Sequence, residues 1–388
     1  MVATVSTLHS PAQEIERLHA LHHQQLEAFR ADPMPDAAAR IEKLRKLKTA
    51  LVQQQDSLVK AVNEDFSCRA EGDTLIAEIM TTVQALNYMV KNVRKWMRPS
   101  GRHVNMLFAP ASNEVVYQPL GVIGIIVPWN YPIQLALVPI ATALAAGNRA
   151  MVKMSEFTPA TNRALKDMLA SVFDEDEVAI IEGEVDVSSA FSEVPWNHLI
   201  FTGSTAVGKH VMAAAAKNLT PVTLELGGKS PALIAPDANL EHAAERICFG
   251  KSLNAGQTCI APDYVLVPEG KEKEFIGRYH QAFTKMYPTM KDNDDYTAII
   301  NDRQYQRLFS WLKDADEKGA KSQFLSTPRP DLKTTPGSEL DRGFSPPTRG
   351  QGTLIRGSCN SQGRSDRTTR FLLCVRKARN ARGSEVIR

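Results

Sequence analysis

Two side chains of the sequence, Cys259 and Glu225, could together carry out chemistry on a carbonyl group. Cys259 lies in the turn-rich stretch NAGQTCIAPDYVLV, directly before an apolar run typical of a strand. A substrate can reach a cysteine there, and neighbouring backbone N–H groups can stabilise its thiolate and donate to an oxyanion. The thiolate would attack a carbonyl carbon and hold a thioester once hydride has left. The alternative is a small buried hydrophobic residue, the usual role of a free cysteine.

Glu225 precedes Cys259 by 34 residues, in the stretch LELGGKSP, where a carboxylate interrupts an apolar run. Because burying an unpaired carboxylate is costly, this position predicts a specific role. A partly buried glutamate suits a general base that activates water against the thioester. Gly227 and Gly228 leave space around it and permit unusual backbone angles. The alternative is a structural ion pair, for example with Lys229.

Asn130 ends the stretch VPWN, which we expect at the C-terminal end of a strand, where open α/β sheets place ligands. Its side-chain amide could donate a hydrogen bond to a developing oxyanion. The alternative is a turn residue or the N-cap of the following helix.

Two further stretches have the form of a nucleotide site. FTGSTAVGK (201–209) predicts a strand, a glycine turn and a helix start, which can hold a phosphate. In KMSEFTP (153–159), which follows another strand, Lys153 and Glu156 could both reach ribose hydroxyls. The alternative for the second stretch is a surface loop in which Ser155 caps a helix.

The elements that would position these residues follow from the hydrophobic pattern. Apolar residues near helical period predict helices over 11–31, 36–64 and 72–97, and an extended hairpin over 103–121 turns near 109–113. From Gly121 onward, short β-type apolar runs alternate with helical segments. These runs lack strict alternation, as expected for strands covered on both faces, and so predict a doubly wound α/β sheet.

Composition bounds the class of protein. The 388 residues suggest two or three domains, and the 43% hydrophobic content supports a substantial core. The net charge of +3 arises in residues 322–388, and because the rest is mildly acidic we expect no nucleic-acid partner. The apolar run 133–147 is too short to span a bilayer and predicts a buried helix.

Cysteine and histidine usage points to an intracellular chain without a metal. The N-terminus has no secretory pattern, and five cysteines without paired spacing predict a reducing cytoplasm. His19, His22 and His23 cluster on one predicted helix, where we expect a solvated face rather than a metal site.

In order and spacing, five of these motifs together resemble the aldehyde dehydrogenase superfamily. They are PWN (128–130), KMSEFTP (153–159), FTGSTAVG (201–208), LELGGKSP (224–231) and GQTC (256–259). The resemblance covers residues 15–320 and is strongest to the class 3 branch and, within it, to bacterial coniferyl aldehyde dehydrogenases. It implies oxidation of an aromatic or medium-chain aliphatic aldehyde with NAD or NADP, and for the intact family a homodimer.

The resemblance also implies a role for each matching residue. Cys259 would be the nucleophile, Glu225 the general base, and Asn130 would stabilise the oxyanion together with the Cys259 backbone N–H. The cofactor would be held by Trp129, Lys153, Glu156, Gly203, Ser204 and Gly208. Ser252 stands where the family often has an aromatic residue.

The end of the chain departs from the family. After residue 320 the periodicity stops, and the later E-I-F-G-P and P-F-G-G motifs of the family are absent. We expect three parts: N-terminal helices with a dinucleotide-binding domain (1–224), a partial catalytic domain (225–321), and a basic, disordered tail (322–388). A frameshift near residue 321 would explain the change. The alternative function is a truncated, non-catalytic remnant that at most binds a dinucleotide.

Overall fold

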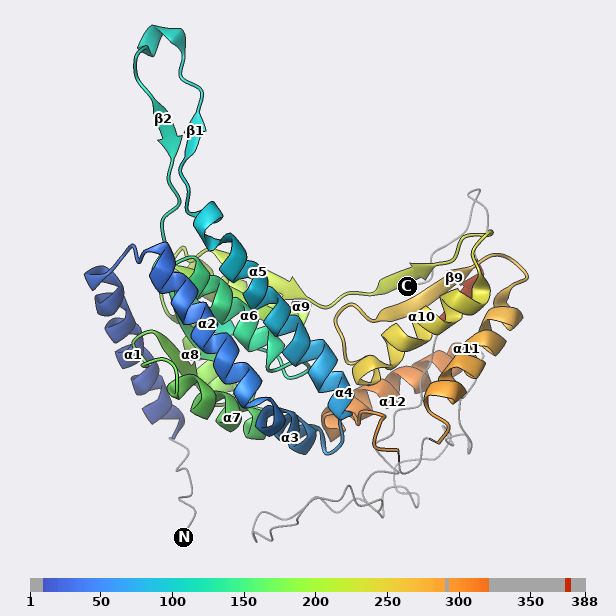
Figure 1. Ribbon diagram of the computed structural model, residues 1–388. Helices are drawn as coiled ribbons and strands as arrows, with labels where there is room; N and C mark the ends of the chain where they lie inside the picture. The colour runs from blue at the N-terminus through green and yellow to red at the C-terminus, as the bar shows by residue number, and fades with distance from the viewer. Residues whose placement is uncertain (1–9, 290–292, 321–373, 378–388) are drawn as a thin grey trace. The chain divides into compact units, whose positions relative to one another are not determined.

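The structure is a computed structural model that describes residues 10–289, 293–320 and 374–377 (Figure 1). The chain forms two compact units. Of the described residues, the first unit contains those of 10–65 and 71–227, and the second contains those of 66–70 and those from 228 onward. The chain therefore passes finally from one unit to the other between Gly227 and Gly228.

The first unit begins with helices that match the predicted pattern in part. Helix α1 (Pro11–Ala31) starts with a capping box between Ser10 and Gln13. The prediction of a single helix over 36–64 is wrong. It is divided into α2 (Ala37–Gln53) and α3 (Gln55–Phe66), because Gln54 leaves the helical backbone angles. Each of the two helices buries its own apolar stripe.

The third predicted helix contains an irregular segment. Helix α4 (Glu71–Thr74) continues into the π-helical turn η1 (Leu75–Met80) and then into α5 (Thr81–Trp96). A hairpin follows, in which β1 (Ser100–Arg102) pairs with β2 (Asn113–Val115) around the short helix η2 (Met106–Phe108). Its strands begin earlier than predicted, and it projects from the helices of this unit (Figure 1).

A five-stranded parallel sheet forms the centre of the first unit. Its order is β5-β4-β3-β6-β7. The strands are β3 (Val122–Ile126), β4 (Arg149–Lys153), β5 (Val178–Ile181), β6 (His198–Gly203) and β7 (Val222–Leu226). The central strands are apolar and largely buried, as expected for a sheet covered on both faces.

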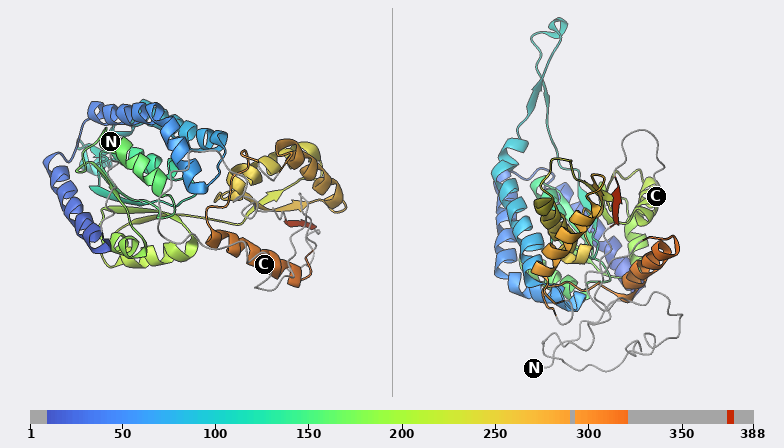
Figure 2. Two further views of the ribbon diagram at one scale, coloured as in Figure 1. Left: turned by 90° about the horizontal axis from the view of Figure 1, so that it is seen from below. Right: turned by 90° about the vertical axis from the view of Figure 1, so that its right-hand side faces the viewer.

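Helices cover both faces of this sheet (Figure 2). The connecting helices are α6 (Gln134–Ala145), α7 (Pro159–Ala170), α8 (Val185–Glu193) and α9 (Thr205–Ala216). Helix α6 packs on β3 and β4, with α2 and α5 outside it, whereas α1 and α9 pack on strands and α8 lies between them. The doubly wound Rossmann-type fold is therefore confirmed, and strand order reverses between β3 and β6.

The second unit is a smaller α/β body. Three parallel strands, in the order β10-β9-β8, pack with helices around a core that includes Val265, Phe275 and Tyr296. The strands are β8 (Ser230–Leu233), β9 (Pro262–Val267) and β10 (Cys374–Lys377). The helices are α10 (Leu240–Ser252), η3 (Leu253–Gly256), α11 (Glu272–Met286) and α12 (Asp302–Glu317).

The tail expected to be disordered lies outside the described residues, except for β10. The four residues of that strand pair with β9. Among the helices that the structure describes, none combines the length and the apolar content needed to cross a bilayer.

The expected solvated face for the histidine cluster is wrong for one member. His22 is 7% exposed, and its ring packs edge-on against Trp196, with the two centroids 5.0 Å apart. It lies one helical turn after the fully buried Leu18, and this register carries it into the core. Burial lowers the pKa of His22 to about 4, so the ring is neutral at physiological pH.

Candidate active site

The predicted site residues of the first unit lie along one edge of its sheet. The strand register pairs Ile126 with both Lys153 and Phe201, and it pairs Thr202 with Glu225. The carboxyl ends of β3, β4, β6 and β7 therefore lie side by side, and the loops that follow β3 and β6 flank the point where strand order reverses. Open α/β sheets bind ligands at such a point.

Asn130 lies in the loop between β3 and α6. The loop comprises residues 127–133, and both Trp129 and Asn130 are half-buried in it. The N-cap alternative for Asn130 is wrong, because the N-cap position of α6 is Ile133, three residues later. Asn130 is therefore a half-buried bend residue in the loop that follows β3.

Lys153 ends β4 with its side chain almost fully inside the protein. It is 1% exposed, and its ammonium group donates a hydrogen bond to the carbonyl oxygen of Met154 at 2.6 Å. Burial lowers the pKa of Lys153 to about 8, although the charges of Glu156, Glu182 and Glu14 oppose this shift. A buried amine at a ligand-binding edge is a strong hydrogen-bond donor with little water to compete for it.

The loop after Lys153 is held by internal hydrogen bonds. The Ser155 hydroxyl accepts from the backbone N–H of Phe157, and the Asn162 amide donates to the carbonyl oxygen of Ser155 at 2.8 Å. Ser155 does not cap α7, so that part of the surface-loop alternative is wrong: the N-cap position is Thr158. Glu156 is exposed at the turn of the loop.

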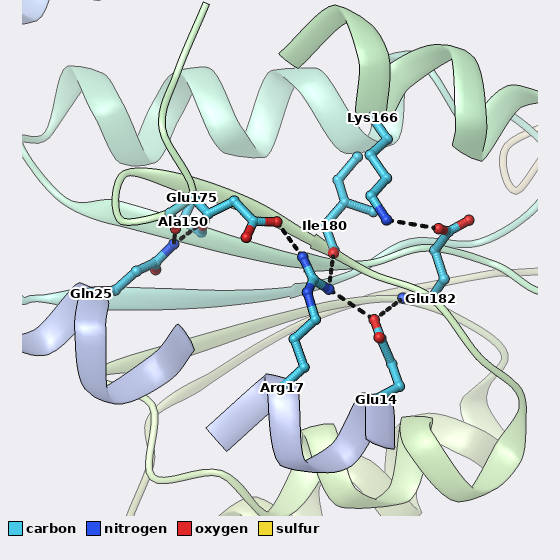
Figure 3. A network of polar contacts seen from close by, with 8 residues as sticks. All are labelled: Glu14, Arg17, Gln25, Ala150, Lys166, Glu175, Ile180 and Glu182. Atoms are coloured by element: carbon cyan, nitrogen blue, oxygen red, sulfur yellow. Dashed lines mark hydrogen bonds and ion pairs between the residues drawn. The ribbon is translucent and has the colours of Figure 1, made fainter. Parts of the chain in front are cut away.

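Glu14 and Glu182, two of the carboxylates whose charges affect the pKa of Lys153, belong to a network of polar contacts that fastens α1 to the sheet (Figure 3). Glu14 accepts from Arg17 at 2.9 Å and from the backbone N–H of Glu182, directly after β5, at 3.1 Å. Arg17 also pairs with Glu175, and Lys166 pairs with Glu182 at 3.3 Å. Because these carboxylates have other partners, they offset the charge of Lys153 only in part.

The stretch Gly203–Gly208 has the predicted form. Strand β6 ends at Gly203, Ser204 is the N-cap of α9, and its hydroxyl accepts from the backbone N–H of Val207 at 3.4 Å. Gly208 is buried where α9 meets β7, and a Cβ there would lie 2.9 Å from the Leu226 side chain. This glycine permits close packing of the helix, and the helix N-terminus faces the same sheet edge as Lys153.

Glu225 departs from its predicted surroundings. It is exposed, because β7 is the edge strand of the sheet and alternate positions along it face solvent. The expectation of a partly buried carboxylate is wrong for this chain. The ion pair suggested with Lys229 is also wrong, since Lys229 pairs with Asp263 at 3.1 Å. Gly227 and Gly228 keep negative φ, although a Cβ at either would meet nothing within 4 Å.

Cys259 belongs to the second unit and lies in the turn between η3 and β9. Its side chain is exposed, whereas Cys68 and Cys248 are buried. The alternative of a buried hydrophobic residue is therefore wrong. Within its own unit the thiol is open to a substrate, as the sequence predicts.

The backbone leading to Cys259 is unusual and firmly anchored. Asn254, Ala255 and Gly256 all have left-handed φ, at 51°, 50° and 70°. Gln257 then ties the turn to the neighbouring segment: its amide donates to the carbonyl oxygen of Ala298 and accepts from the N–H of Ile300. Left-handed backbone at a non-glycine residue is costly and persists where surrounding contacts enforce it.

The first unit thus gathers Asn130, Lys153, Glu156, Ser204 and Glu225 at one sheet edge, and the second unit carries Cys259. The donor set of that edge fits a dinucleotide. A buried ammonium and an exposed carboxylate suit ribose hydroxyls, and the N-terminus of α9 suits a phosphate. Among the residues that the structure describes, no group of three or more His, Cys, Asp or Glu could hold a metal.

Sequence reasoning missed two residues of this edge, Glu78 and Asp65. Both are carboxylates on N-terminal helices, and each accepts hydrogen bonds from the start of a helix that follows a site loop. The register of Glu78 with Thr82, Leu86, Met89 and Val93, all buried, could have revealed it. No sequence signal identified Asp65, which lies at the end of α3.

Comparison with known proteins identifies relatives for most of the chain. A sequence family described as "Aldehyde dehydrogenase family" matches residues 6–334. A Pseudomonas aeruginosa protein named "Probable coniferyl aldehyde dehydrogenase" is 56% identical over 82% of this chain and 67% of its own length. The "Coniferyl aldehyde dehydrogenase" of a Pseudomonas strain is 45% identical over 73% of this chain and 58% of its own length.

Solved structures give the same assignment. The substrate-bound AldH of Staphylococcus aureus superimposes with a TM-score of 0.74 and 33% identity, over 79% of this chain and 68% of that one. A Mycobacterium tuberculosis aldehyde dehydrogenase complexed with NAD+ gives a TM-score of 0.73 and 27% identity, over 81% and 65%. The matched part of this chain spans about three fifths to two thirds of the length of these relatives.

Proposed function

This chain belongs to the aldehyde dehydrogenase family, and on that basis we propose that it oxidises a hydrophobic aldehyde to the carboxylic acid. The observation that carries the proposal is the exposed thiol of Cys259, held in an anchored turn with left-handed backbone. The names of two relatives favour an aromatic aldehyde such as coniferyl aldehyde.

In the proposed reaction, Cys259 provides the nucleophile. Its thiolate attacks the aldehyde carbon, and the carbonyl oxygen becomes an oxyanion. The side-chain amide of Asn130 and the backbone N–H of Cys259 donate hydrogen bonds to that oxygen. A bound NAD+ or NADP+ supplies the acceptor for the hydride that leaves this carbon.

Glu225 acts in the second half of the reaction. With the thioester formed on Cys259, its carboxylate takes a proton from a water molecule, and the resulting hydroxide attacks the acyl carbon. The carbon–sulfur bond then breaks, which releases the acid and regenerates the thiolate.

Lys153, Glu156 and Ser204 would hold the dinucleotide, together with Trp129, Gly203 and Gly208. The buried ammonium of Lys153 donates to a ribose hydroxyl, the Glu156 carboxylate accepts from one, and the start of α9 receives a phosphate. We propose NAD+ as the preferred cofactor. The negative charges of Glu14, Glu156 and Glu182 raise the pKa of Lys153, and the same charges would repel the additional phosphate group of NADP+.

Incubation of the full chain with coniferyl aldehyde and NAD+ tests this proposal directly. We expect aldehyde-dependent formation of NADH and of the carboxylic acid, both measured by chromatography, and their loss in Cys259→Ala. The matched control is Cys68→Ala, which alters a buried thiol of the same unit. Binding of NAD+ without any turnover would refute the catalytic proposal and favour a dinucleotide-binding remnant.

A further inference from the structure

Two helices that follow the site loops begin without a cap of their own. Helix α6 follows the loop of Asn130, and α7 follows the loop of Lys153 and Glu156. Neither N-cap residue, Ile133 nor Thr158, accepts a hydrogen bond from its helix through its side chain. Helix α9, in contrast, is capped by its own Ser204. Since the first N–H groups of a helix need acceptors, another part of the chain must supply them for α6 and α7.

Glu78 supplies the acceptor for α6. One of its carboxylate oxygens accepts from the backbone N–H of Ile133 at 2.7 Å and from that of Gln134 at 3.1 Å. The side chain is fully buried and belongs to the π-helical turn η1. A carboxylate that accepts from helix N-terminal N–H groups forms charge-assisted bonds, about twice as strong as neutral ones.

These bonds fix one end of the loop that carries Asn130. The other end is fixed by the backbone N–H of Val127, which donates to the carbonyl oxygen of Lys153 at 3.0 Å. Only residues 128–132 lie between the two anchors. The carboxylate of Glu78 therefore limits where the Asn130 amide and the Trp129 ring can lie.

Asp65 performs the same task at α7. Its two oxygens accept from the backbone N–H groups of Ala160 at 2.9 Å and Thr161 at 2.8 Å, and from the Thr161 hydroxyl at 2.6 Å. Burial raises the pKa of Asp65, and the hydrogen bonds from Thr161 and Ala160 oppose this shift. This carboxylate fixes the end of the loop 154–158, just after Glu156.

We propose that Glu78 and Asp65 are positioning residues, through which the N-terminal helices hold the two loops of the sheet edge. Glu78 sets the position of Asn130, the oxyanion donor, and Asp65 sets the position of the dinucleotide-binding loop. This inference rests on the proposed function for the roles of the loops, but the hydrogen bonds themselves do not depend on it.

The test uses Glu78→Gln and Asp65→Asn in the full chain. Both changes keep the shape of the side chain and remove its charge, so the variants should fold. The matched control is Gln25→Met. The Gln25 side chain is a fully buried polar group of α1, and it donates to the carbonyl oxygens of Ala150, near the start of β4, and Glu175, before β5, outside the site loops. The readouts are hydrolysis of p-nitrophenyl acetate, the NAD+ Kd by calorimetry, and kcat for aldehyde oxidation.

We expect the two variants to separate these readouts. Glu78→Gln lowers ester hydrolysis and kcat about tenfold, since small misplacement of a reacting group is costly, and raises the NAD+ Kd by no more than about threefold, because Trp129 is the one dinucleotide-binding residue that we place in its loop. Asp65→Asn raises the NAD+ Kd about tenfold, equal to about 1.4 kcal/mol, and leaves ester hydrolysis without nucleotide within about twofold. Gln25→Met lowers the melting temperature and changes none of the three readouts.

Equal losses in all three variants, or no loss in any, would overturn the positioning roles. A wild-type chain that neither oxidises aldehydes nor hydrolyses the ester would refute the proposed function instead. In that case amide hydrogen exchange, which needs no activity, tests whether Glu78 and Asp65 hold the two loops. Glu78→Gln should speed exchange in residues 127–137 only, and Asp65→Asn in residues 154–165 only, whereas faster exchange in both segments, or in neither, contradicts the proposal.

Discussion

Replacing Lys153 by methionine should make the unliganded protein more stable at neutral pH and weaken its binding of NAD+. Lys153 is 1% exposed, and burial lowers its pKa from 10.5 to about 8. Keeping its charged form inside the folded protein therefore costs about 3 kcal/mol at pH 7 relative to the unfolded chain. Methionine has a similar length and carries no charge, so it removes this cost.

The sign of the pH dependence follows from the two pKa values. Below pH 8 the folded and the unfolded chain both hold the proton, and the full cost is present. Between pH 8 and 10.5 only the unfolded chain holds it, so the stability of the wild type rises with pH. Above pH 10.5 neither state holds it. The stability advantage of Lys153→Met should therefore be greatest below pH 8 and disappear by pH 10.5.

Calorimetric melting of both proteins between pH 7 and 10.5 measures this difference. For a unit of this size, about 3 kcal/mol corresponds to a rise in melting temperature of about 6–12 °C at pH 7. Because other groups titrate equally in both proteins, the difference between them isolates Lys153. The NAD+ Kd should rise by at least about tenfold, as expected when a charged hydrogen bond is lost.

A lower melting temperature for Lys153→Met at pH 7 would refute the reasoning, and so would a difference independent of pH. The first result would mean that the hydrogen bond to the Met154 carbonyl, with the surrounding carboxylates, outweighs the cost of burial. The second would mean that packing rather than charge controls the site. Unchanged NAD+ affinity would separate the stability argument, which would stand, from the binding role, which would not.

Three further expectations concern the other reactive groups. Iodoacetamide should modify Cys259 well before the buried Cys68 or Cys248, as peptide mass spectrometry can follow; equal rates would contradict an accessible thiol. Glu225→Gln should allow one burst of NADH and then stop, with a melting temperature within about 1 °C of wild type, because the side chain is exposed; continued turnover would exclude it as the base. Ala255→Gly should raise the unfolding free energy by about 1 kcal/mol, since φ is 50°, and a loss of stability would argue against strain there.

The sheet and its loops could be predicted from the sequence because each depends on local patterns. Apolar runs without alternation identify strands covered on both faces, and the strands β3, β4 and β5 confirm this. The glycine turn before α9 was equally readable, since Gly203, Ser204 and Gly208 each meet a local requirement of a strand end, a cap or a close contact.

The errors arose where the surroundings of a side chain depend on distant parts of the chain. Glu225 occupies an apolar run that resembles a buried strand. However, β7 is the outermost strand of its sheet, and the Glu225 side chain is exposed. His22 belongs to a polar histidine cluster, yet the docking of α1 places it against Trp196. Sequence patterns identify a strand or a helix, but which face it buries is decided by the neighbours it acquires.

The residues proposed to react or bind are easier to recognise from the sequence than the carboxylates that hold their loops in place. Asn130 and Lys153 follow strand ends, so their place is set within a few residues of sequence. Glu78 and Asp65 accept hydrogen bonds from backbone N–H groups that lie 55 and 95 residues later in the chain and carry no side-chain signature. Any residue except proline can offer such an N–H, so the partner leaves no trace in the sequence. A buried carboxylate that lies on the apolar face of an early helix is the signal to seek, because its cost predicts that donors wait elsewhere in the fold.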